Sequence, residues 1–120
     1  IMFYRQNGDV ISAKFGANDI KIGQIVTVDA TGNAKAGEAG KDFLGIALEN
    51  TADVIRGNEV RICTEGVFEL GKDSAVATDL GKGVKIVDAD KVAVTSAPTD
   101  VKIGQIVGIV NESKVLVKIK

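Results

Sequence analysis

The side chains that could carry chemistry are few, because the 120 residues include no histidine and only one cysteine. Without an imidazole, the chain can build no Ser-His-Asp triad, no histidine proton shuttle and no histidine-ligated metal site. Cys63 has no histidine to activate it and lies within a strand pattern, which indicates a buried structural thiol. These residues predict no catalytic site, no cofactor and no metal centre.

Two glycine-rich segments approach phosphate-binding motifs without completing them. A Walker A loop at Gly40-Lys41 would need a glycine five residues earlier and a serine or threonine next, but Lys35 and Asp42 stand there. The run at residues 81–83 begins like a dinucleotide fingerprint, but Ile86 occupies the third glycine position and a strand follows in place of a helix. Neither segment therefore predicts a nucleotide site.

Two further patterns have simpler structural interpretations. Asp88 and Asp90 have the spacing of calcium ligands, but Val92 and Val94 occupy the next ligand positions, so a hairpin turn is favoured. Lys85 lies between two aliphatic residues, as the modified lysine of biotinyl and lipoyl carriers does. The methionine or acidic neighbours of those carriers are missing here. No active site is predicted at either place.

The elements that would hold these residues are β-strands. The chain has 16 valines and 13 isoleucines against five leucines, and 14 glycines interrupt the apolar stretches. Stiff β-branched side chains suit a pleated sheet. The length predicts a single domain over residues 1–120, with residues 1–9 as a possible N-terminal arm. We predict an all-β fold, a small β-barrel or sandwich of about nine or ten short strands.

Apolar residues alternate with a period of two along most of the chain, which predicts where the strands lie. The expected strands are residues 9–15, 23–29, 43–49, 58–70 in two parts, 83–88, 91–96, 104–110 and 114–120. Gly66 is expected to separate the two parts of the fourth stretch. Residues 30–42 are predicted to form a loop and residues 72–80 a short helical turn, so at most one short helix is expected.

The hexapeptide "KIGQIV" occurs at residues 21–26 and again at residues 102–107, but the residues that follow the two copies diverge at once. We interpret both copies as a glycine turn that leads into a strand. A better internal match aligns residues 23–36 with residues 81–94, which predicts a half-domain repeat of nearly 60 residues.

Charge and composition argue against several partners. The formal net charge is −1, with no basic run and five aromatic residues, so nucleic acid is not an expected partner. No apolar run approaches the roughly 18 residues of a membrane span and no signal-peptide pattern is present, so neither insertion nor export is expected. A single cysteine is typical of synthesis in a reducing cytoplasm.

Most of the chain resembles the small capsid cement, or head decoration, proteins of tailed bacteriophages and prophages. The pattern that carries the resemblance consists of Gly8-Asp9-Val10, Gly45-Ile46-Ala47, the strand pair at residues 64–70, the strand at residues 81–88 and the final hairpin that begins with Ile103-Gly104. The resemblance implies a non-enzymatic virion protein that is made in the bacterial cytoplasm and binds the outside of an assembled capsid to reinforce it.

The resemblance also implies partners. The expected partner is the major capsid protein, and a homotrimer is the expected assembly, because closed symmetry repeats one small contact. Two alternatives stay open, namely another virion β-module such as a tail or baseplate part, and a small-ligand-binding or carrier barrel. Five aromatic residues are few for an apolar ligand pocket.

The N-terminal residues are the predicted contact with the capsid or with a neighbouring subunit. Phe3 and Tyr4 lie beside Met2 and Arg5, and methionine, aromatic residues and arginine are enriched at interface cores. Such side chains are costly to leave exposed on a short arm. The alternative is that this segment pairs as an edge strand on its own domain.

Overall fold

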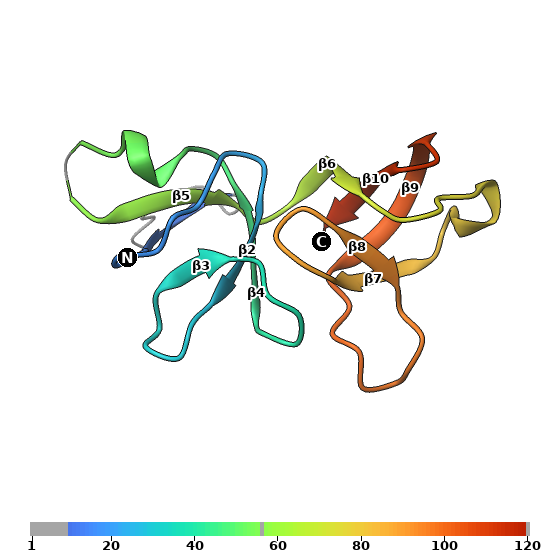
Figure 1. Cartoon of the computed structure of the whole chain (residues 1–120), viewed down its shortest axis with the longest axis horizontal. Coiled ribbons are helices and arrows are strands. Elements are labelled where there is room, and N and C mark those ends of the chain that lie inside the picture. The colour runs from blue at the N-terminus through green and yellow to red at the C-terminus, as the bar shows by residue number, and fades with distance from the viewer. Residues whose placement is uncertain (1–9, 56, 120) are drawn as a thin grey trace, which may run out of the picture.

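The computed structural model describes residues 10–55 and 57–119, and these residues form two five-stranded antiparallel sheets that lie side by side (Figure 1). The first sheet contains β1 (Val10–Lys14), β2 (Ile25–Val28), β3 (Ala34–Ala36), β4 (Phe43–Ala47) and β5 (Glu59–Cys63). The second sheet contains β6 (Gly66–Gly71), β7 (Gly83–Ile86), β8 (Val92–Val94), β9 (Gly104–Asn111) and β10 (Lys114–Ile119). The all-β prediction is confirmed, and the arrangement is sandwich-like, with no closed barrel among the described residues.

In the part of the chain that the structure describes, helical structure is limited to two short 3₁₀ segments. They are η1 (Thr51–Asp53) and η2 (Ala77–Asp79), and the second lies inside the stretch predicted to form a helical turn. No α-helix occurs in the described ranges, and none of their helices has the length and apolarity to cross a membrane.

The two sheets repeat one topology, as the predicted half-domain repeat requires. The strand order is β1-β5-β4-β2-β3 in the first sheet and β6-β10-β9-β7-β8 in the second, so each strand corresponds to the one five places later. The hairpin registers agree as well, because Val26 pairs with Ala36 and Val84 pairs with Val94. The second hairpin thus repeats the first 58 residues later. We call residues 10–63 the first half and residues 66–119 the second half.

Strand β3 corrects one element of the sequence prediction. Residues 34–36 were expected to lie in a loop, but they form an edge strand that pairs with β2. Alanine and lysine are weak strand formers, so local preference gives no sign of this strand. Its pairing partner β2 determines the conformation.

The halves share one hydrophobic core cluster and the first half has a second one. The shared cluster contains Ile106, Val115 and Val117 from the second half, together with Ile25 and Ile46 from the first. The other cluster lies within the first half. Its fully buried members are Ile20, Val26, Ala34, Ala47, Val60 and Ile62. Strand β2 contributes to both clusters because neighbouring residues of a strand point to opposite faces.

The two "KIGQIV" copies have different structures. In the first, Gly23 lies in a turn with φ of +86° that leads into β2, as predicted. In the second, Gly104 is already the first residue of β9 and does not lie in a turn, so the prediction of a turn there is wrong. A side chain at Gly104 would meet the carbonyl oxygen of Lys118, and this close approach explains the glycine. Gly66 has φ of +136° and separates β5 from β6 as expected.

Candidate functional site

The junction between the halves is formed by one face of the first sheet and the β7–β8 hairpin. The backbone N–H of Ile25 donates to the carbonyl oxygen of Ala89 at 2.8 Å. Glu38 and Asp88 form an isolated antiparallel bridge close by. Phe43 packs against the shared core cluster. The hairpin of the second half is therefore seated on the first sheet by both backbone and apolar contacts.

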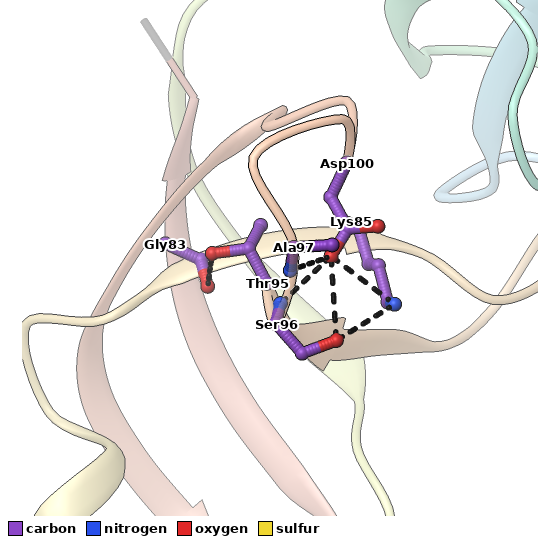
Figure 2. A network of polar contacts seen from close by, with 6 residues as sticks. All are labelled: Gly83, Lys85, Thr95, Ser96, Ala97 and Asp100. Carbon is purple, nitrogen blue, oxygen red and sulfur yellow. Dashed lines mark hydrogen bonds and ion pairs between the residues drawn. The ribbon is translucent and has the colours of Figure 1, made fainter.

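Next to this junction, the loop between β8 and β9 is organised by Asp100 (Figure 2). Its Oδ2 accepts the backbone N–H of Ser96 at 2.7 Å and that of Ala97 at 2.9 Å, and the Lys85 ammonium lies 3.3 Å away. The two N–H groups, and after them Lys85, hold the pKa of Asp100 below its usual value. The Oδ2 atom of this carboxylate is thus committed to shaping the loop.

A hollow of about 270 Å³ lies between this loop and the β3–β4 loop of the first half. Its lining residues come from both halves and are Ala39, Gly40, Lys41, Lys85, Ile86, Thr99, Asp100 and Val101. Lys85 and Asp100 neutralise each other, so the charge that remains in the lining is that of Lys41. Small side chains dominate the rest. The hollow offers shape for a contact but no reactive constellation.

A second hollow, of about 260 Å³, opens on the outer face of the second sheet. Lys102, Gly104, Gln105 and Lys118 line it. The alkyl chain of Lys102 lies over Gly83, where an added Cβ would be only 2.8 Å from the Lys102 Cε. Both lysines are exposed, and neither forms an ion pair with any residue that the structure describes. This hollow is therefore positively charged.

Asp29 closes the β2–β3 turn. Its carboxylate accepts from the Asn18 side chain, from both the hydroxyl and the N–H of Thr31, and from the N–H of Asn33, at 2.7–2.9 Å. These bonds, first among them the one from Asn18, hold the pKa of Asp29 well below its usual range. Both oxygens of this carboxylate therefore accept hydrogen bonds within the first half.

Asp79 forms the one strongly buried ion pair of the described chain. Its Oδ2 lies 2.9 Å from the Lys72 ammonium, and the two side chains are only 8% and 11% exposed. It also accepts the N–H of Val76 at 3.0 Å, and this bond, followed by that from Lys72, lowers the pKa of Asp79. The pair fixes the segment before β7 and is largely shielded from solvent.

The residues singled out from the sequence are not brought together into one site. Cys63 is half-buried where full burial was predicted, and its thiol lies 3.0 Å from the carbonyl oxygen of Glu65. Asp90 donates its N–H to the Asp88 carboxylate at 2.8 Å within the β7–β8 turn, so the prediction of a hairpin turn is confirmed. Within the described ranges, no group of three His, Cys, Asp or Glu side chains could hold a metal ion.

The predicted contact residues Met2, Phe3, Tyr4 and Arg5 lie outside the described residues. Sequence reasoning missed the positively charged hollow. Lys102 and Lys118 are far apart in the chain and meet only through strand pairing between β9 and β10. The available signal was the second "KIGQIV" copy, which supplies Lys102 and Gln105.

Comparison with known proteins gives a family match. The family model described as phage cement protein matches residues 5–120 of the chain. No curated protein and no solved structure matches it.

Proposed function

Because this chain belongs to the phage cement protein family, we propose that it binds the outer surface of an assembled phage head and reinforces it without catalysing a reaction. The match over residues 5–120 carries this proposal, since it extends over nearly the whole chain. A cement protein is a structural component of the virion capsid. The functional site of such a protein is a contact surface, and the exposed loops and sheet faces described above are its candidates.

The stabilising effect follows from mass action. A ligand that binds the assembled lattice and not the free subunits adds its binding free energy to the stability of the assembly. The proposed partner is the major capsid protein, whose copies form that lattice. We further propose that the chain, made in the host cytoplasm, acts as a homotrimer. Closed symmetry would repeat one small contact three times and raise the overall affinity.

Met2, Phe3, Tyr4 and Arg5 are proposed to anchor the protein to the head or to a neighbouring subunit. Their support is their chemistry, since a few aromatic and arginine anchors commonly dominate an interface. Deleting residues 1–6 should leave the melting of the isolated protein nearly unchanged. Binding to heads should fall at least about tenfold, roughly 1.4 kcal/mol. Replacing Gln6 and Asn7 by alanine provides a matched control that should bind normally.

The function is tested by mixing the purified protein with heads that lack it. Electron microscopy should show additional density on the outer surface, and the decorated heads should resist heating or dilution better than bare heads. Absence of density would contradict the proposal. Co-purification with tails in place of heads would favour the tail or baseplate alternative.

A further inference from the structure

One row of paired residues crosses the first sheet at the place where the second half is seated. Val10 pairs with Cys63, Cys63 with Ile46, and Ile46 with Ile25. Ile25 and Ile46 are at most 1% exposed and belong to the core cluster that the two halves share. Ile25 also donates its N–H to Ala89 of the β7–β8 hairpin. In the first half, this row is therefore an internal docking surface.

The corresponding row of the second sheet is open. Val67 pairs with Lys118, Lys118 with Gln105, and Gln105 with Gly83, on the strands that correspond one by one to those of the first row. Gly83 thus takes the place of Ile25, Gln105 that of Ile46, and Lys118 that of Cys63. Val67, Gln105 and Lys118 are all exposed. The position that is covered in the first half is uncovered in the second.

The residue types at this position also differ between the two halves. Phe43, two residues before Gly45, packs in the junction, while the residue two before Gly104 is the exposed Lys102. We call Gly83, Lys102, Gly104, Gln105 and Lys118 the cationic face. It surrounds the hollow of about 260 Å³, whose lining contains two lysines and no acidic residue. Gln105 is held in place because its amide donates to the carbonyl oxygen of Gly81 at 2.8 Å.

The replacement of apolar residues by lysines decides which kind of partner can bind the cationic face. If another half packed here as the second half packs on the first, Lys102 and Lys118 would be buried against apolar side chains. Burying charges without partners is strongly unfavourable, so the face disfavours continued head-to-tail assembly of the chain. A partner that supplies carboxylates would instead pair with both ammonium groups.

We propose that the cationic face binds an acidic segment of the major capsid protein, an inference that rests on the proposed function. The internal junction shows the geometry that this position accommodates, namely a turn whose backbone reaches the sheet. On the cationic face, the hollow offers room for such a segment, and the two exposed lysines that line it select its charge. Exposed charge pairs are screened by salt, so this contact should weaken as the ionic strength rises.

The test compares two double variants for binding to undecorated heads at several salt concentrations. Lys102→Ala with Lys118→Ala removes the two cations of the face. Lys14→Ala with Lys21→Ala removes two exposed cations of the first half and changes the net charge equally. A third protein, Lys102→Arg with Lys118→Arg, keeps the charge. Melting curves of all three confirm that each is folded.

We expect the affinity of the Lys102→Ala/Lys118→Ala protein for heads to fall at least about tenfold and to lose much of its dependence on salt. The arginine variant and the Lys14→Ala/Lys21→Ala control should bind nearly as the parent does. Equal losses in both alanine pairs would overturn the inference, because the effect would then be one of net charge. So would normal head binding with loss of self-association, which would make the face a contact between copies. If the parent protein itself does not bind heads, the proposed function fails first, and the two failures are thereby distinguished.

Discussion

The carbonyl oxygen of Cys63 occupies the space that a side chain on Gly45 would need. Gly45 lies in β4 and is buried between β2 and β5, where Val26 and the end of β5 approach it closely. The second half repeats this relationship, because a Cβ on Gly104 would lie 2.5 Å from the carbonyl oxygen of Lys118. The same glycine is thus required at the same place in both sheets.

Replacing Gly45 by alanine should therefore destabilise the protein by about 3 kcal/mol or more, since the backbone of β5 would have to move. Urea unfolding monitored by circular dichroism measures this loss. The control is Gly32→Asn, at a turn with φ of +86° and no atom within 4 Å of the added Cβ, a conformation that asparagine tolerates. A Gly45→Ala protein as stable as the control would contradict the close approach.

The two buried threonines give a matched pair with opposite expectations. The hydroxyl of Thr27 has no hydrogen-bond partner among the described residues, although the residue is fully buried. Thr27→Val should be neutral or stabilise the protein by up to about 1 kcal/mol, because it removes an unsatisfied polar atom and keeps the shape. Thr51 behaves differently, since its hydroxyl accepts the N–H of Ile20 at 2.9 Å.

Thr51→Val leaves that N–H buried without a partner and should cost about 1–3 kcal/mol. Thermal melting and urea unfolding of both variants provide the measurement. If Thr27→Val cost as much as Thr51→Val, the Thr27 hydroxyl would have to be hydrogen bonded in solution.

The strands of this fold were largely predictable because valine and isoleucine alternate with polar residues along them. The strand prediction failed where the alternation of apolar and polar residues gives no sign of a strand. β3 contains only Ala34, Lys35 and Ala36, so its strand conformation follows from pairing with β2. The only sequence signal for it was the alignment with residues 92–94, which form β8. In Ile25, Val26 and Thr27 the alternation disappears, because both faces of β2 are buried.

The arrangement of the halves and the cationic face could not be predicted for a related reason. Ile25 and Ile46 look like ordinary core residues in sequence, and only the paired registers show that they form a surface on which another sheet is seated. Lys102 and Lys118 look like solvent-exposed strand residues. Their proposed role in binding becomes visible only when they are compared with the residues at the corresponding positions of the first half.

Cys63 is predicted to be dispensable for binding. Cys63→Ala should cost at most about 1 kcal/mol, because the side chain is half-buried and the change is small, and head binding should persist. Ile62→Asp and Val117→Asp should instead unfold the protein, since each would place an unpaired carboxylate in a core position with no exposure. Far-ultraviolet circular dichroism separates the two results. A folded Cys63→Ala protein that no longer binds heads would assign the thiol a role in the contact.

The buried pair of Lys72 and Asp79 predicts how stability depends on acid. The pKa of Asp79 is lowered by the N–H of Val76 and by Lys72, so in the unfolded chain the carboxyl takes up its proton at higher pH than in the folded protein. Its stabilising contribution is therefore complete above the usual carboxyl pKa near 3.8 and is lost as the pH falls through the lower pKa of the folded state. Asp79→Asn should melt at a lower temperature than the parent at pH 7, and its melting temperature should fall less steeply between pH 4 and pH 2.

Asp73→Asn is the control, because this carboxylate is 83% exposed in its pair with Lys91 and its replacement should change neither the melting temperature at pH 7 nor its fall in acid by much. Identical pH profiles for the parent and Asp79→Asn would show that the buried pair does not contribute to stability in solution.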